Sequence, residues 1–66
     1  MQFDFPEQEA AVEAVIARND GHVVALPAAS GAVEILTRDQ RMVVHVDGTA
    51  TVDGRQQLSY QEVLEG

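Results

Sequence analysis

Residues 33–52 read Val-Glu-Ile-Leu-Thr (33–37), Arg-Asp-Gln (38–40), Arg-Met-Val-Val-His-Val (41–46), Asp-Gly (47–48) and Thr-Ala-Thr-Val (49–52). Runs rich in β-branched residues favour strands. An Asp-Gly pair between two such runs is typical of the two-residue type I′ turn that closes a β-hairpin. The stretch therefore predicts a hairpin over residues 41–52, joined to a strand at 33–37 by a short polar connection.

A two-residue loop at this Asp-Gly pair would fix the register of the hairpin. Val44 would then lie opposite Thr51 and Val43 opposite Val52, so that each face of the hairpin would be partly apolar. An antiparallel sheet with one solvated face normally alternates more cleanly between apolar and polar side chains. We therefore expect both faces of the sheet to be covered, which a single helix cannot do.

An amphipathic helix is predicted from about Pro6 to Asn19. Proline suits the first turn of a helix, and Asp20-Gly21 supplies a stop signal. The apolar stripe of this helix consists of Ala11, Val12, Val15 and Ile16. Residues 1–5 place Met1, Phe3 and Phe5 on one side of an extended segment, which predicts an edge strand or an arm, and Asp4 with Glu7 matches a capping box.

Further strands are expected on both sides of residues 33–52. His22–Leu26 has the composition of a strand, and residues 27–31, Pro-Ala-Ala-Ser-Gly, suit a hairpin loop leading to residue 33. A second Asp-Gly pair at 53–54 predicts another turn, after which residues 55–58 would pair back as a short strand.

The C-terminal residues predict a short helix. Ser59 and Glu62 have the spacing of a capping box, with Leu58 and Val63 at the positions of a hydrophobic staple. About two turns fit before Gly66, fewer than the ~12 residues at which an isolated helix becomes marginally stable. The helix must therefore dock, either on its own sheet or on a neighbouring chain.

These features predict one α+β domain over residues 1–66. An N-terminal helix packs on a three- to four-stranded antiparallel β-meander, and a short C-terminal helix follows. A domain of this size buries only about 60% of its unfolded surface. The chain has no cysteine and shows no zinc-site pattern, so oligomerisation is the remaining means of stabilising a small core.

The chain is strongly acidic. Eleven Asp and Glu residues stand against four arginines, with no lysine, for a net charge of −7. Such a charge repels phosphate backbones, so we expect no direct binding to nucleic acid and favour a basic protein as partner. No apolar run approaches the ~20 residues of a membrane span. We expect a soluble, cytoplasmic protein that does not bind membranes.

Two groupings of side chains are candidate chemical sites. His45, Asp47 and Asp53 lie near the predicted turns and are the nearest approach to a metal cluster, but turn geometry already accounts for both aspartates. Ser30 with His22 or His45 as base lacks the spacing of a nucleophile elbow. We therefore expect no catalytic, cofactor-binding or metal-binding residues and no enzyme activity. An enzyme using His45 with a carboxylate is the third hypothesis.

The predicted function is non-catalytic protein–protein interaction or regulation, carried out by a homodimer or higher homo-oligomer. Its interface is predicted to include Val43, Val52, Val63 and Leu64. The alternative is an acidic inhibitor, similar to an antitoxin, that occupies the basic cleft of a nucleic-acid enzyme. The carboxylates that would imitate phosphates are Glu7, Glu9, Glu13 and Glu34.

Overall fold

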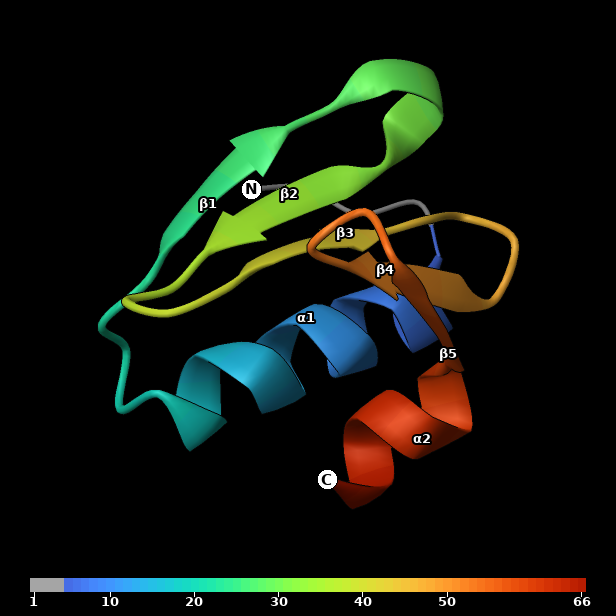
Figure 1. Ribbon diagram of the computed structural model, residues 1–66. Coiled ribbons are helices and arrows are strands. Elements are labelled where there is room, and N and C mark those ends of the chain that lie inside the picture. Colours follow the sequence, from blue (N-terminus) through green and yellow to red (C-terminus); the bar gives the residue numbers. More distant parts are fainter. Residues whose placement is uncertain (1–4) are drawn as a thin grey trace.

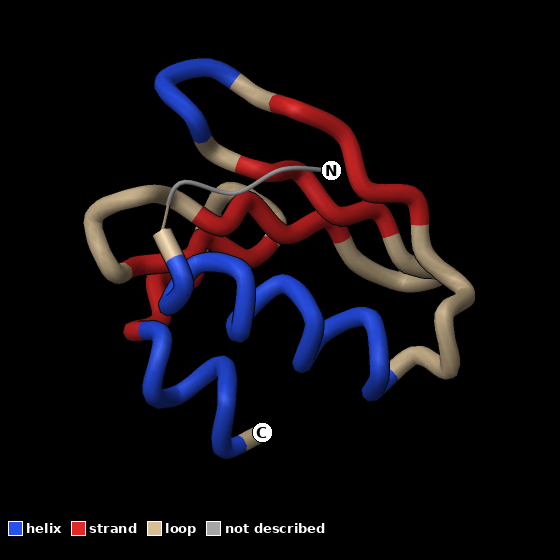
Figure 2. The backbone as a smooth tube through the Cα atoms, turned by 180° about the vertical axis from the view of Figure 1, so that it is seen from behind, coloured by secondary structure: helices blue, strands red, loops and turns tan. Residues whose placement is uncertain are grey.

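The computed structural model describes residues 5–66 as one five-stranded sheet with two α-helices on one of its faces (Figure 1). The elements in chain order are α1 (Pro6–Arg18), β1 (Val24–Pro27), a 3-10 turn (Ala29–Gly31), β2 (Val33–Leu36), β3 (Arg41–Val44), β4 (Thr49–Val52), β5 (Gln56–Ser59) and α2 (Tyr60–Glu65). Each strand pairs antiparallel with the next, and Figure 2 shows the helices side by side. The predicted α+β class and meander topology are confirmed.

The sheet has five strands, so the predicted count of three to four was too low, although the short strand predicted at residues 55–58 is present as β5, Gln56–Ser59. The strand β5 is largely polar and gives a weak strand signal, but the turn before it is strong. Asp53 and Gly54 both have positive φ angles, 53° and 69°, and Arg55 N–H donates to the Val52 carbonyl at 3.0 Å. This geometry is typical of a type I′ turn, which returns the chain antiparallel to β4. Leu58 then packs against the core.

The first Asp-Gly pair does not form the predicted two-residue turn. Residues 45–48 connect β3 to β4, and a hydrogen bond from His45 N–H to the Thr49 carbonyl at 2.9 Å leaves residues 46–48 as a three-residue loop. Gly48 has a φ of 96°, whereas Asp47 does not have a positive φ. Asp47 instead accepts hydrogen bonds from the backbone N–H and the hydroxyl of Thr49, at 3.0 and 2.6 Å. An aspartate that bonds to the backbone two residues on is a different turn device from the type I′ pair.

The additional loop residue shifts the β3–β4 register by one position from the predicted register. Val44 pairs with Ala50, and Met42 pairs with Val52. When one strand shifts by one residue relative to its neighbour, all of its side chains move to the opposite face of the sheet. These four apolar residues consequently share one face. The predicted pairs, Val44 with Thr51 and Val43 with Val52, were wrong because they treated Val46 as a strand residue.

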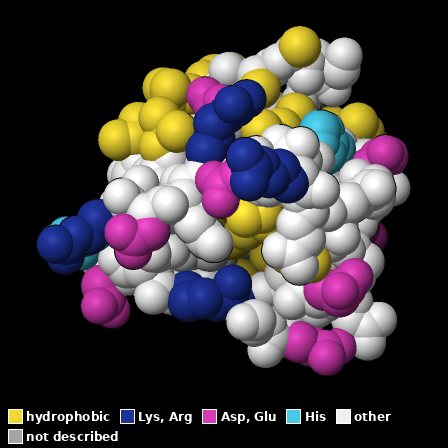
Figure 3. Space-filling model, viewed as in Figure 1, with side chains coloured by type: hydrophobic (Ala, Val, Ile, Leu, Met, Phe, Trp, Pro, Cys, Tyr) yellow, Lys and Arg dark blue, Asp and Glu magenta, His cyan; other side chains and the backbone are white. Residues whose placement is uncertain are grey.

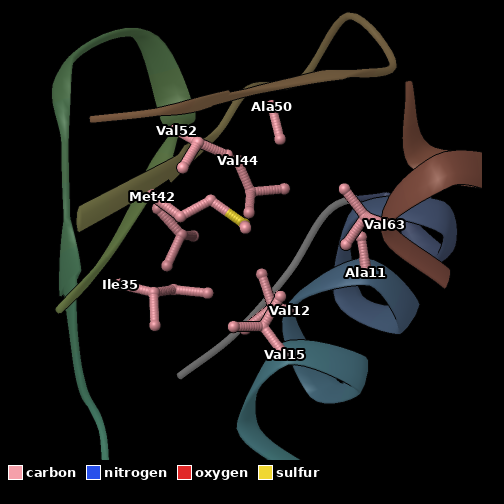
Figure 4. Close-up of a cluster of buried hydrophobic side chains, with 10 residues drawn as sticks. Ala11, Val12, Val15, Ile35, Met42, Val44, Ala50, Val52 and Val63 are labelled. Carbon is pink, nitrogen blue, oxygen red and sulfur yellow. The ribbon is translucent and has the colours of Figure 1, made fainter. Parts of the chain in front are cut away.

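The core lies between that face of the sheet and the two helices (Figure 4). Val12 and Val15 project from α1 toward Ile35 and the β3 side chains, and Val63 projects from α2 beside Ala11. The buried cluster consists of Ala11, Val12, Val15, Val33, Ile35, Met42, Val44, Ala50, Val52 and Val63. Small aliphatic side chains fill this cluster, which limits the apolar surface that the domain buries.

A buried glutamine joins α1 to the sheet. Gln8 is only 2% exposed, and its Nε2 donates to the carbonyls of Gly31 at 3.0 Å and Val44 at 3.2 Å. These acceptors belong to the β1–β2 connection and to the end of β3, so one amide positions the first helical turn against two separate segments. No sequence signal singled out this residue. Pro6 occupies the first helical turn as predicted, whereas the arm at Met1 and Phe3 and the cap at Asp4 lie outside the described residues.

The short helix α2 docks on its own chain. The predicted capping box is present, because Glu62 N–H donates to Ser59 Oγ at 3.1 Å and Ser59 N–H donates to Glu62 Oε1 at 3.0 Å. Val63 is 1% exposed, and Arg18 Nη2 of α1 donates to its carbonyl. Of the two docking partners left open by the sequence, the helix uses its own chain. Neither described helix combines the length and apolar character needed to span a bilayer.

We predict that Gln8→Ala lowers the free energy of unfolding by about 1–3 kcal/mol, because two carbonyls at the helix–sheet contact lose their donor. Urea denaturation followed by circular dichroism measures the change. Gln61→Ala is the control, since Gln61 is an exposed glutamine on α2, and it should change the stability by less than about 0.5 kcal/mol. Equal effects of the two substitutions would show that the Gln8 bonds do not hold the helix.

Candidate functional site: the outer face of the sheet

The sheet face opposite α1 and α2 is called the outer face here, and the described residues leave apolar side chains exposed on it. On β1, Val24 is 53% exposed and Leu26 is 42% exposed, and on β2 Leu36 is 36% exposed. Isolated exposed apolar residues are normal on protein surfaces. A contiguous group on one face is more informative, because large exposed apolar patches mark interaction sites.

The register places these side chains in two adjacent rows across three strands. In one row, Leu36 lies between Val24 and Arg41. The second row consists of Leu26, Glu34 and Val43, with Glu34 in the middle. We call the six residues of these rows the outer patch; they are Val24, Leu26, Glu34, Leu36, Arg41 and Val43. In the space-filling view, hydrophobic side chains gather over the β1–β2 end of the sheet, near charged side chains (Figure 3).

An ion pair lies within the outer patch. Arg41 Nε is 2.5 Å from Glu34 Oε2, and the side chains are 58% and 25% exposed, respectively. Solvent screens a pair at this exposure, so its contribution to folding is on the order of 0–1 kcal/mol. The pair therefore contributes little to the stability of the single chain, but it places one charge of each sign among apolar side chains.

The rest of the outer face is polar. His45 Nε2 and Thr51 Oγ1 form a hydrogen bond of 2.8 Å across β3 and β4. Gln57 of β5 pairs with Thr51, and Ser59 of β5 pairs with Thr49. The apolar character of this face is thus confined to β1, β2 and the adjoining part of β3.

Charge is distributed unequally between the two layers. The segment that contains the sheet, residues 22–59, has four carboxylates and three arginines, for a net charge of −1. Residues 5–21 and 60–66, which contain the helices, have six carboxylates and one arginine, for a net charge of −5. The acidity of the chain is therefore concentrated in the helical layer, and the outer face belongs to the nearly neutral layer.

The predicted interface residues do not share one surface. Val43 lies half-buried in the outer patch, whereas Leu64 is 50% exposed on α2, in the opposite layer. Val52 and Val63 are 8% and 1% exposed and belong to the core. Core packing thus removes Val52 and Val63 from the candidate surface. Sequence reasoning missed the exposed apolar side chains of β1 and β2, because it lacked the strand register that brings them together.

The predicted acidic surface is also divided. Glu9 and Glu13 are exposed on α1 and, being four residues apart, lie on the same side of that helix. Glu7 is exposed on the first turn of α1. Glu34 lies on the outer face of the sheet, where Arg41 neutralises it. The four carboxylates therefore do not form one negative face, and Glu34 is separated from the others by the thickness of the sheet.

The side chains of the candidate catalytic and metal-binding residues form hydrogen bonds within the hairpins. The Asp47 carboxylate accepts hydrogen bonds from Thr49, Asp53 Oδ1 accepts one from Arg41 N–H at 3.0 Å, and His45 bonds to Thr51. Across residues 5–66, no group of three or more His, Asp or Glu side chains is arranged to hold a metal ion. The β3–β4 hairpin brings His45 and Asp47 near each other, but their side chains bond to different threonines.

The serine candidate lies in a turn. Ser30 is exposed within the 3-10 turn Ala29–Gly31 and has a positive φ of 59°. His22 is exposed in the connection between α1 and β1. Within the described part of the chain, no hydrogen bond joins Ser30 to His22 or His45. Gly31 has a φ of 79°, and a Cβ there would lie 3.2 Å from Val46 Cγ1, so this turn packs closely against the β3–β4 loop.

Two titratable groups near the β3–β4 loop have pKa values that differ from their usual values. The hydrogen bond from the Thr49 side chain lowers the pKa of Asp47 below its usual value, and the nearby His45 acts in the same direction. Burial raises the pKa of the Tyr60 phenol, and the negative charges of Asp47 and Glu7 add to this effect. The Tyr60 hydroxyl donates a hydrogen bond to the His45 carbonyl. Both groups form hydrogen bonds to residues of the β3–β4 hairpin, and neither lies in the outer patch.

Comparison of the chain with protein-family models, with curated proteins and with solved structures gives no match.

We predict that Thr49→Val raises the pKa of Asp47 toward its usual value, because the largest cause of the shift is the bond from the Thr49 hydroxyl. An NMR titration of the Asp47 carboxyl carbon measures it. A carboxyl with a lowered folded-state pKa stabilises the fold above its unfolded pKa, and this contribution is lost as the pH falls through the folded pKa. Thr49→Val should therefore weaken the acid dependence of stability.

The control for this titration is Thr51→Val, which removes a hydroxyl that bonds to His45 rather than to Asp47. It should leave the titration of Asp47 close to that of the unmodified protein. If the two variants raise the pKa of Asp47 equally, the Thr49 hydroxyl is not the cause of the shift.

Proposed function

We propose that the protein is a non-catalytic interaction module that associates with a second copy of itself through the outer patch. The observation that supports this proposal is the contiguous exposure of Val24, Leu26 and Leu36 in the nearly neutral layer of a strongly acidic chain. Two copies that met through their helical layers would bring together the regions of highest negative charge. Two copies that meet through their sheets keep those regions apart.

The expected affinity follows from the size of the patch. Burial of the three exposed aliphatic side chains in each of two copies would stabilise the contact, and the lost translational and rotational freedom of the two chains opposes it. A patch of this size predicts a weak, concentration-dependent dimer rather than a permanent one. Because each copy carries a net charge of −7, added salt should strengthen the dimer by screening the repulsion.

Catalysis has no part in this proposal. The polar side chains around the β3–β4 hairpin have hydrogen-bond partners within the hairpin, as described for His45 and Asp47. The absence of enzyme activity and the cytoplasmic location remain predictions from the sequence. An activity of the purified protein that is lost in His45→Ala and kept in Thr51→Val would favour the enzyme hypothesis instead.

We predict that Leu36→Glu shifts the protein toward monomer by at least about tenfold in dissociation constant, because two charges would be buried in the contact. Light scattering across a dilution series up to millimolar protein, in low and molar salt, measures the mass. Leu64→Glu is the matched control, because it introduces the same charge on α2, and it should leave the association unchanged. Val24→Glu, at the half-exposed start of β1, replaces Leu36→Glu if that variant unfolds.

These outcomes separate two surfaces. If Leu64→Glu dissociates the protein and Leu36→Glu does not, the contact lies in the helical layer and the outer patch is excluded. If the unmodified protein is a folded monomer at every concentration and salt, self-association is excluded.

A second candidate function is capture of a basic protein by the helical layer. The observation that favours it is the net charge of −5 in residues 5–21 and 60–66. Glu7, Glu9 and Glu13 remain in this hypothesis, whereas the ion-paired Glu34 does not. The partner class is still a basic nucleic-acid enzyme whose cleft the carboxylates would occupy.

For this second candidate we predict that a purified basic nuclease binds at low salt and is released steeply as salt rises, because exposed charges are screened beyond a Debye length. Isothermal titration at two salt concentrations measures the binding. Glu9→Gln/Glu13→Gln should weaken it, while Glu34→Gln serves as the control outside the helical layer. Binding that does not change with salt would contradict the electrostatic mechanism.

A further inference from the structure

We propose that two copies stack their outer faces about a two-fold axis that passes near the Glu34–Arg41 pair, so that each Glu34 also faces Arg41 of the second copy. This inference rests on the proposed function and adds its geometry. It specifies face-to-face stacking in place of edge-to-edge strand pairing, and it gives the ion pair a role in partner orientation.

The free edge at β1 is poorly suited to pairing with another strand. Ala28 N–H donates to the Ala32 carbonyl at 2.8 Å. Because successive N–H groups of a strand point in opposite directions, those of residues 24, 26 and 28 point toward β2. On this alternation, the outward N–H positions of β1 are 25 and 27. Residue 27 is Pro27, which has no N–H to donate. Only Ala25 can then donate outward from this strand.

The free edge at β5 also has fewer N–H groups available to a neighbouring strand, but for a different reason. Tyr60 N–H donates to the Gly48 carbonyl at 2.9 Å, so the outward N–H positions of β5 are 57 and 59. Ser59 N–H is already used, because it donates to Glu62 in the capping box of α2. One outward donor, at Gln57, remains on this strand. Natural sheets commonly reduce edge pairing by such means. Because both edges of this sheet are poorly suited to pairing, we take the outer face as the surface for self-association.

The charges of the outer patch complement themselves. A two-fold contact is isologous, so the same patch is used on both copies. Because Glu34 and Arg41 already lie 2.5 Å apart, an axis near the pair places two such pairs side by side in antiparallel orientation. Each carboxylate then has a guanidinium neighbour in its own chain and another in the second chain. The surrounding apolar side chains of the patch exclude water from this group and strengthen it.

The same arrangement explains how a chain of net charge −7 can contact its own copy. The outer patch contains one positive and one negative side chain, so the contact itself is neutral. The helical layers, with their excess of carboxylates, lie on the far sides of the stacked sheets. Opposite charges in the contact favour one orientation, whereas apolar side chains alone would allow several.

Charge-swap variants test this arrangement. In a dimer of Glu34→Arg, guanidinium groups would face each other at both of the symmetry-related positions of the contact, and in a dimer of Arg41→Glu, carboxylates would do so. We expect each single variant to associate at least about tenfold more weakly than the unmodified protein, because like charges meet in the contact. An equimolar mixture of the two variants should regain association, because each chain then faces the opposite charge in its partner.

The mixture separates contacts between chains from contacts within one chain. Neither single variant can form the pair within its own chain, so recovery on mixing depends on the contact between chains. Native mass spectrometry distinguishes the heterodimer from both homodimers by mass, and light scattering gives its dissociation constant. Thermal denaturation of each variant confirms folding, and the double variant Glu34→Arg/Arg41→Glu, which restores the pair in reversed order, should associate like the unmodified protein.

The possible failures are distinguishable. Suppose that the unmodified protein dimerises and Leu36→Glu disrupts the dimer, but the mixture binds no more tightly than either single variant. The contact between Glu34 and Arg41 of the second copy is then wrong, and the proposed function stands. If the unmodified protein does not dimerise, the proposed function fails and this inference fails with it. If Gln57→Pro, which removes the outward N–H of β5, abolishes dimerisation and Leu36→Glu does not, pairing occurs at an edge and face stacking is overturned.

Discussion

The length of the β3–β4 loop is the constraint on which the rest of the structure depends. Three residues in the loop, closed by the bond from His45 N–H to the Thr49 carbonyl, place Met42, Val44 and their partners on one face. That face receives both helices, and the opposite face is left with the outer patch. A loop of two residues would have divided the same apolar side chains between both faces, and the helical layer could then have covered only part of them.

The small core explains why polar contacts matter in this domain. Its buried side chains are mostly valine and alanine, so the apolar gain from any one contact is modest. Gln8 compensates at the start of α1 by bonding to two carbonyls of the sheet layer, and Arg18 holds the end of α2 at the end of α1. The helices are therefore positioned by directional bonds as well as by packing. Net charge separates along the same boundary, since the helical layer carries most of the acidity.

The outer patch and the sheet edges differ in what they offer to a second copy. Pro27 and the capping box at Ser59 each remove an outward donor from an edge strand, while Val24, Leu26 and Leu36 remain exposed on the face. The fold thus limits one route of association and leaves another open. The Glu34–Arg41 pair contributes little to the single chain, but within a contact between copies it would favour one orientation over others.

The sequence by itself determined the α+β class, the meander order, the capped C-terminal helix and the excess of acidic residues, because these features depend on local signals. Pro6 in the first helical turn and Ser59 with Glu62 act over a few residues. The turn at Asp53-Gly54 is likewise a local signal, and it predicts the polar strand that follows it, Gln56–Ser59. Only the tertiary structure decided the candidate site. Whether Asp47 enters a type I′ turn or bonds to Thr49 is a choice between two local geometries, and packing of the whole sheet selects one. That choice sets the register, and periodicity cannot assign apolar side chains to a face until the pairing of strands distant in sequence is known.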